Sequence, residues 1–241
     1  MGHHSTSSWA MASHLVRANI KYFLAVWLLL FFGVAAAAGI VALFTDPTVS
    51  ILDFTTTPPR YWMLVVGILF PGLIARVYIA HGVTRTNLAR GAVIATVVIS
   101  VALGLLMAVA FGIEHLVFQA NGWSAVIEGH LFSTSDRFGL VFIEFTAVYI
   151  THFLAGWGIG LLYLRFKKSL ATVLLIPAFV PAAMTEWMLR TGWLGNAWNG
   201  AVGGEFLAPL PAMVITVGII ALQIGVNYAV MRTMPVAAKS D

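Results

Sequence analysis

Three polar side chains, Glu144, Tyr149 and His152, stand within one long apolar stretch of this 241-residue sequence. An ionisable residue inside a membrane span is costly and is therefore a functional candidate by default. Glu144 and His152 are eight residues apart, which places them near one helix face but about 12 Å apart along the axis. They cannot touch each other, so a proton relay would need waters or partners from other helices. The alternative is a protonated Glu144 that is hydrogen-bonded in the interior of a helix bundle.

The elements that position these residues are apolar stretches of about 20 residues, the length that crosses a bilayer core. They are Ile20–Phe44, Tyr61–Ala80, Gly91–Phe111 (extendable to Phe118), Phe138–Leu164, Leu170–Met188 and Leu207–Met231. Hydrophobic residues make up 60% of the chain and charged residues only 9%, which excludes an ordinary soluble domain. We predict an all-α integral membrane protein, a bundle of six transmembrane helices over residues 18–232. Residues 1–17 and 233–241 would be short cytoplasmic flanks.

The basic residues divide unevenly between the two sides of this bundle. With the N-terminus in the cytoplasm, ten of the 13 Lys and Arg residues fall inside, and Arg60, Arg137 and Arg190 fall outside. Most acidic residues, Asp53 and Glu186 among them, fall outside or at outer helix ends. Because Lys and Arg favour cytoplasmic loops, both termini are predicted to be cytoplasmic. The net charge of +4 is therefore explained by topology, and no nucleic-acid partner is expected.

Two segments are predicted to lie at the membrane surface. Ser8 to Tyr22 is expected to form an interfacial helix. Leu189 to Phe206 mixes tryptophans with Gly and Asn, which favours a short re-entrant or interfacial helix, with a Gly-rich loop as the alternative. Residues 1–14 contain two adjacent histidines, too few for a standard affinity tag, so a native and a vector-derived origin both stay open.

Small and amide side chains predict where the helices contact each other. Gly156 and Gly160 form a small-xxx-small pattern that permits close helix packing, within the subunit or across a dimer. Gln223 and Asn227, four residues apart in the last span, are interpreted as hydrogen-bonding contacts between helices.

Enzyme motifs are missing from the sequence. It contains no G-x-S-x-G, no H-E-x-x-H and no P-loop, and it has no cysteine. Glu186 to Arg190 fits E-x-x-x-R and Phe111 to His115 fits F-x-x-x-H, two patterns of glutamate-type CAAX proteases. Here they come in reverse order, without the adjacent second glutamate and without H-x-x-x-N, so we interpret them as coincidence. We predict a chain that is not an enzyme, with no catalytic residue, metal or cofactor of its own.

Two segments carry a resemblance to a known family. Ala80–Gly91 (AHGVTRTNLARG) resembles the G-[VS]-[ST]-R-x-x-[FL]-x-x-G signature of bacterial type-2 ABC transporter permease subunits. Gly156–Ser169 (GWGIGLLYLRFKKS) is similar to the small-residue fourth helix of that family and the aromatic–x–Arg–Phe turn that ends it. Lys167 stands where the family usually has glycine. Six spans with both termini inside also agree, and the resemblance extends from about Ala18 to Arg232.

The resemblance implies an exporter permease subunit in a bacterial plasma (inner) membrane, without an ATPase of its own. It would pair with a second permease subunit, a homodimer being favoured by the Gly156–Gly160 surface, and with a cytoplasmic ABC ATPase that binds ATP and Mg. Its ATPase-coupling loop would comprise Arg76, His81, Gly82, Thr84, Arg85 and Arg90. Arg85 and Arg90 would pair with acidic residues of the ATPase, and residues 1–17 would supply an interfacial connecting helix.

The family resemblance also implies a pathway at the dimer interface, lined mainly by the second and fifth spans. Phe70, Phe179 and Pro181 are the expected lining residues, and Pro177 and Pro181 are expected to kink the fifth span. Few ionisable groups lie in the spans, so the expected cargo is apolar or amphipathic: a lipid, a peptide antibiotic or a drug.

Two alternatives stay open. One is a proton-coupled or passive small transporter that uses Glu144 and His152. The other is a non-catalytic subunit of a larger membrane complex.

Overall fold

The computed structural model describes residues 7–124, 127, 129–192, 195, 197 and 208–233. Its elements are α1 (Ser8–Ala42), η1 (Leu52–Thr55), α2 (Thr57–Leu69), η2 (Phe70–Ala75), α3 (Arg76–Ala80), α4 (Arg85–Asn121), α5 (Phe138–Arg165), α6 (Lys168–Met188) and α8 (Pro209–Arg232). Within these residues the chain forms helices and no strand element. Six helices are long and apolar enough to cross a membrane, with Leu52–Ala80 counted as one. The predicted all-α membrane fold with six spans is confirmed at this level.

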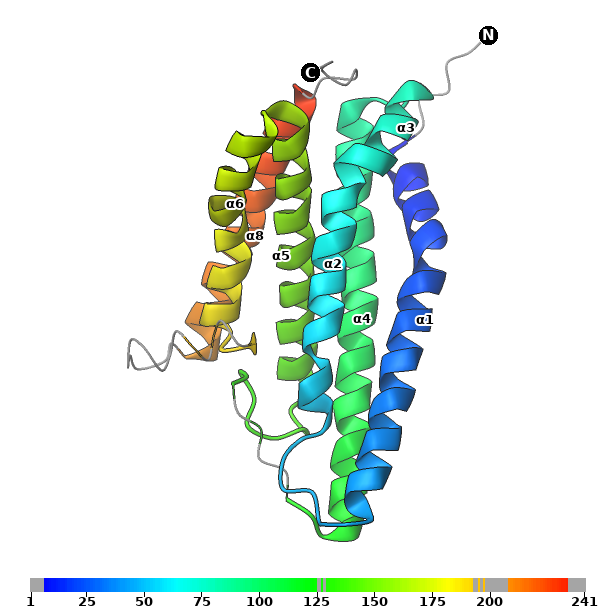
Figure 1. The fold of residues 1–241 in the computed structure, drawn as a ribbon, viewed down its shortest axis with the longest axis vertical. Coiled ribbons are helices and arrows are strands. Elements are labelled where there is room, and N and C mark those ends of the chain that lie inside the picture. The colour runs from blue at the N-terminus through cyan, green and yellow to red at the C-terminus, as the bar shows by residue number, and fades with distance from the viewer. Residues whose placement is uncertain are drawn as a thin grey trace.

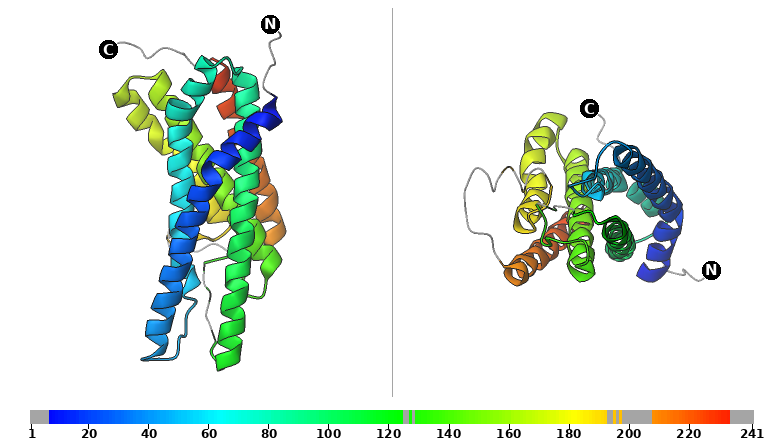
Figure 2. Two further views of the ribbon diagram at one scale, coloured as in Figure 1. Left: turned by 90° about the vertical axis from the view of Figure 1, so that its right-hand side faces the viewer. Right: turned by 90° about the horizontal axis from the view of Figure 1, so that it is seen from below.

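The helices form one bundle in which α5 is central (Figures 1 and 2). It contacts α2, α4, α6 and α8, and it is the most buried of the six spans, whereas α1 packs on α4 and is the least buried. The start of α1, the α3–α4 turn and the end of α8 share one end of the bundle, which we name the terminal end. The loop end is the opposite one, with η1, the α4–α5 loop and the end of α6.

Two helices are longer than the sequence predicts. α1 is one continuous helix of 35 residues, so the expected interfacial helix and the first span are a single element that crosses the boundary predicted at residue 17. α4 has 37 residues and is about 55 Å long. It begins at an N-cap, where the Thr84 hydroxyl accepts from the Asn87 N–H, and ends at left-handed Gly122 (φ 70°). No strong helix-breaking residue interrupts either segment between its caps.

The helix α2 widens into the π-helical segment η2 before it reaches α3. Pro71 lies at the start of that segment, and proline has no N–H to donate to the carbonyl four residues earlier. Local π-helical geometry is a common adjustment where the regular hydrogen-bond ladder is interrupted. The second span therefore contains a built-in irregularity near the terminal end.

Glycines bring α2 and α5 into backbone contact. The Cα of Gly156 faces the Leu64 carbonyl, that of Gly160 faces the Ile68 carbonyl, and Gly67 of α2 faces the Phe153 carbonyl. The small-xxx-small pattern therefore packs two helices of one chain. This corrects the argument for a homodimer, because the Gly156–Gly160 surface is already occupied by α2.

Some predicted segments fall outside the described residues. The expected interfacial helix over Leu189 to Phe206 is described only at residues 189–192, 195 and 197, which leaves out Trp193, Leu194 and Trp198. Residues 1–6 and the tail beyond Thr233 are also outside.

Candidate functional site

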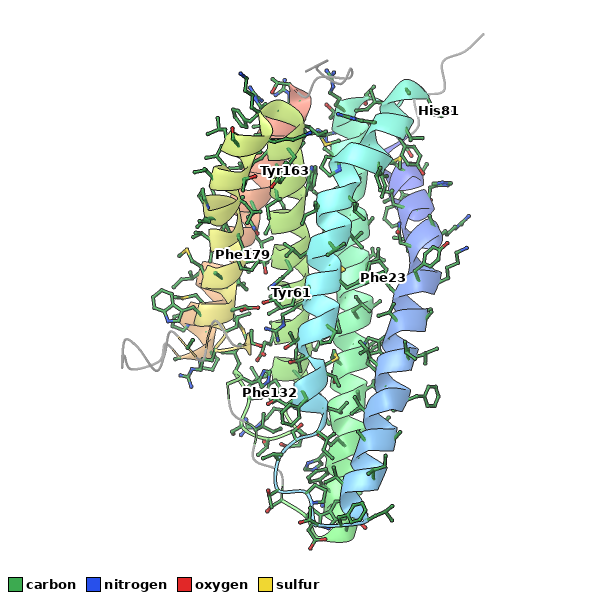
Figure 3. The ribbon with its side chains drawn as sticks, in the orientation of Figure 1. Phe23, Tyr61, His81, Phe132, Tyr163 and Phe179 are labelled. Atoms are coloured by element: carbon green, nitrogen blue, oxygen red, sulfur yellow. The ribbon has the colours of Figure 1, made fainter. Side chains whose placement is uncertain are left out.

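The predicted coupling loop forms a tight exposed turn between α3 and α4 at the terminal end. Gly82 adopts φ 86°, which a residue with a Cβ rarely tolerates, and Thr84 then caps α4. His81, Gly82, Thr84 and Arg90 are exposed, and His81 lies at the tip of this end (Figure 3). Two residues of the predicted set, Arg76 and Arg85, are only partly exposed.

The first turns of α1 brace this turn from the side. Met11 is buried against Gly91, and the Ser8 hydroxyl donates to Asn87 Oδ1 at 3.4 Å. The His14 ring packs edge-on against Tyr78 of α3 at 5.7 Å. The beginning of α1 and the α3–α4 turn therefore form one packed unit.

Two arginines at this end of the bundle, one from α4 and one from α5, form hydrogen bonds to the end of α8. Arg85 Nη1 donates to the Arg232 carbonyl at 3.5 Å, and Arg165 Nη1 donates to the Thr233 hydroxyl at 2.7 Å. A cation is favourable there because the last carbonyls of a helix carry partial negative charge. Arg85 is thus engaged within the chain, whereas Arg90 remains exposed.

At the loop end, His130 joins three separate segments. Its Nδ1 lies 2.5 Å from Glu144 Oε1 of α5, and its Nε2 lies 2.8 Å from Asp53 Oδ1 of η1. The Leu131 N–H donates to the other Glu144 oxygen at 2.8 Å, and the Phe132 ring stacks on His130 at 4.7 Å. Glu144 is fully buried, and His130 and the Leu131 N–H supply the partners that its two oxygens need there. We name Asp53, His130 and Glu144 the His130 clamp.

The two carboxylates hold His130 in its charged form. Burial lowers the pKa of His130, but the charge of Glu144 and the hydrogen bonds to Asp53 and Glu144 outweigh it and raise the pKa to about 9 from 6.5. The folded protein therefore binds this proton more tightly than the unfolded chain does. The stability that it contributes is fully present below pH 6.5 and is lost as the pH rises through 9.

We expect the unfolding free energy to fall by about 2 kcal/mol more between pH 7 and pH 9 in the wild type than in His130→Gln. The measurement is a denaturation curve in detergent micelles at each pH. The variant is the control, since groups that do not contact His130 titrate equally in both proteins. Parallel pH profiles would show that the clamp does not hold a proton.

A second buried polar group lies between α2, α5 and α6. Arg60 Nη1 forms an ion pair with Glu186 Oε1 at 3.0 Å, and the two side chains are 1% and 0% exposed. The remaining Arg60 donors reach the Thr56 carbonyl (3.3 Å), the Thr56 hydroxyl (3.3 Å) and the Thr191 hydroxyl (3.2 Å). His152 Nε2 lies 3.2 Å from the same Glu186 oxygen. We name these five residues the Arg60 cluster.

The chain reversal after α6 supplies part of this cluster. Arg190 (φ 60°) and Gly192 (φ 73°) are both left-handed, and they turn the backbone so that Thr191 reaches Arg60. A left-handed arginine is strained, and such strain is found where the surroundings enforce it. Burial also lowers the pKa of Arg190 below its usual range.

The His152 ring lies against the Glu186 carboxylate. Its Nδ1 lies 2.8 Å from the Val148 carbonyl, which can only accept, so Nδ1 donates there. Its Nε2 lies 3.2 Å from Glu186 Oε1 but makes no hydrogen bond among the described residues. Arg60 is therefore the residue that pairs with Glu186, and His152 packs beside the pair.

The intramembrane residues predicted from sequence belong to two different groups. Glu144 is part of the His130 clamp and His152 is part of the Arg60 cluster, so the two make no contact with each other. Tyr149, between them on α5, is fully buried, and its hydroxyl has no partner among the described residues.

The predicted pathway residues lie in three settings. Phe70 is buried in the interface of α2 and α5, 5.1 Å from the Trp157 ring. Phe179 of α6 packs edge-on against His152 at 6.1 Å. Pro181 borders a cavity between α5, α6 and α8. The expected lining on α6 thus borders a cavity at Pro181. Phe70, by contrast, is packed between helices of the same chain.

Sequence reasoning missed the partners Asp53, Arg60, His130 and Glu186 as site residues. Arg60 and Glu186 were assigned to the outer surface because they stand at the ends of apolar stretches. A usable signal existed for Glu186, which is the one ionisable residue within Leu170–Met188, whereas Arg60 stands directly before Tyr61–Ala80. His130 and Asp53 lie in polar loops and carried no such signal.

Comparison with protein-family models, curated proteins and solved structures finds no match to this chain. Its helices define the class: by length and composition it is an α-helical multi-pass membrane protein.

Proposed function

We propose that this chain is the permease subunit of an ATP-binding cassette exporter that moves an apolar or amphipathic cargo. A separate cytoplasmic ATPase would bind ATP and Mg, and a second permease subunit, a second copy of this chain in the simplest arrangement, would complete the pathway. The observation that carries the proposal is the exposed α3–α4 turn, with Arg90 beside it and α1 packed against it. It forms a compact docking surface on the end of the bundle that we predict to be cytoplasmic.

The helices attached to this turn suit a coupling role. α4 is one continuous helix that runs from the turn to the loop end, so a push on the turn would move the whole helix. On the other side, α3 leads into the π-helical η2, where an irregular hydrogen-bond ladder lowers the cost of bending. One side of the turn is therefore stiff and the other is deformable.

The test begins with purification of the tagged chain from its native membranes, where the proposal expects an ABC ATPase at equal stoichiometry. In proteoliposomes containing this complex, Arg90→Glu is expected to lower the ATPase rate by about tenfold, because reversing an interfacial charge costs about 1.4 kcal/mol or more. Lys168→Glu is the matched control, since Lys168 is an exposed cation on the α5–α6 turn of the same end.

Arg85, the other arginine at this turn, is a less specific probe of docking. Because Arg85 already contacts the Arg232 carbonyl, we expect Arg85→Glu to disturb the end of α8 as well as docking. Arg90 is the cleaner probe. An ATPase at equal stoichiometry that responds equally to Arg90→Glu and Lys168→Glu would contradict the assignment of the turn.

Two ionisable residues buried within α5, Glu144 in the His130 clamp and His152 beside Glu186, favour proton-coupled transport as a second candidate. In that case no ATPase co-purifies, and an imposed pH gradient drives uptake into proteoliposomes of the chain alone. Glu144→Gln would then abolish uptake. Transport thus requires ATP if the first candidate is right and is independent of ATP if the second is right.

A further inference from the structure

A cavity of about 300 Å³ lies between α5, α6 and α8. Its walls are almost entirely apolar, built from leucine, valine, alanine and proline side chains. The two polar residues that line it are Gln223 and Asn227, one turn apart on α8. At about 30 Å³ for each non-hydrogen atom, the cavity has room for about ten such atoms.

Both amide side chains are oriented by α5. Gln223 Nε2 donates to the Thr151 carbonyl at 3.4 Å, and Asn227 Nδ2 donates to the Leu154 carbonyl at 2.8 Å. A carbonyl can only accept, so each NH₂ group must face α5 and each amide oxygen must face away from that bond. Gln223 is 6% exposed, and its Oε1 has no hydrogen-bond partner among the described residues.

The wall formed by α6 contains two prolines. Pro177 and Pro181 both line the cavity, and neither has an N–H. The helical hydrogen-bond ladder of α6 is therefore interrupted beside the cavity. The cavity thus combines one free acceptor, Gln223 Oε1, with no ionisable residue among the described residues that line it.

We propose that this cavity binds an uncharged, mainly apolar molecule, or the apolar end of a larger one, through an O–H or N–H that donates to Gln223 Oε1. A cation would find no carboxylate in the described lining, and a plain hydrocarbon would leave Gln223 Oε1 unsatisfied. The identification of this molecule as the exported cargo rests on the proposed function, whereas its binding to the cavity does not.

The experiment uses the purified chain in micelles and two photoreactive probes, a diazirine-bearing 1-hexanol and its methyl ether. The two share one apolar chain, but only the alcohol can donate. We expect saturable labelling of α6 and α8 by the alcohol, with the ether about tenfold weaker, as expected for the loss of one buried hydrogen bond. The labelled residues are located by peptide mass spectrometry.

Two variants and one control sharpen the result. Gln223→Leu should reduce alcohol labelling to the level of the ether. Ala178→Leu, which fills the cavity from α6 and leaves both amides intact, should suppress labelling by both probes. Thr216→Val is the control, because Thr216 is a buried polar residue of α8 whose hydroxyl donates to the Ala212 carbonyl and which does not line the cavity.

Equal labelling by alcohol and ether would overturn the proposal, since acyl-chain occupancy would then explain the cavity. Protection of the cavity from both probes would also overturn it and would indicate a second subunit seated there. The assay needs no ATPase, so its failure is distinguishable from failure of the proposed function, which co-purification tests.

Discussion

Glu186→Gln is expected to destabilise the folded protein by about 3–5 kcal/mol, the usual cost of removing one partner from a buried ion pair. Arg60 would keep its contacts to Thr56 and Thr191 but lose the only carboxylate that contacts it among the described residues. A guanidinium cannot release its proton, so the charge would stay buried and uncompensated. The measurement is the free energy of unfolding in mixed micelles titrated with SDS.

Arg60→Met should cost less than Glu186→Gln. Without the arginine, the Glu186 carboxylate can be neutralised by taking up a proton, whereas the Arg60 guanidinium cannot release one. The double variant Arg60→Met/Glu186→Gln should lose less stability than the two single variants added together, with a coupling of up to about 3 kcal/mol. Additive losses would mean that the ion pair is not a unit, and equal single losses would contradict the expected neutralisation of Glu186.

Gly156→Ala is expected to cost about 3 kcal/mol or more, or to prevent folding, although it adds a single methyl group. The new Cβ would overlap the Leu64 carbonyl and crowd the Ile68 N–H, and both are backbone atoms of α2 that no rotamer change can move. α2 and α5 would have to separate, which also weakens the contacts of Gly160 and Gly67.

Gly218→Ala provides the matched comparison. It is the same chemical change in α8, where a Cβ would meet nothing within 4 Å, so it should be neutral or slightly stabilising. SDS titrations of both variants test the difference. A similar loss in the two proteins would show that the α2–α5 contact does not limit stability.

The six spans were predictable because a membrane span is a local property of about 20 consecutive residues. The exact helix ends were less predictable from the sequence. α4 extends from Arg85 to Asn121 instead of Gly91 to Phe111 or Phe118, because caps at Thr84 and Gly122 and tertiary contacts of its polar ends decide where it stops. Glu114, near the end of α4, is 8% exposed because it accepts from the Ser50 hydroxyl and from the Ile51 and Leu52 N–H groups.

The sequence by itself determined the class of this protein and marked Glu144 and His152 as intramembrane polar residues, because composition and helical spacing are short-range information. Only the tertiary structure decided their partners. Arg60 and Glu186 are 126 residues apart, and His130 and Asp53 are 77 apart. Which buried charge meets which depends on the order in which α2, α5 and α6 pack, and no local pattern encodes that order. The same packing assigned the Gly156–Gly160 surface to α2 and left Gln223 facing a cavity.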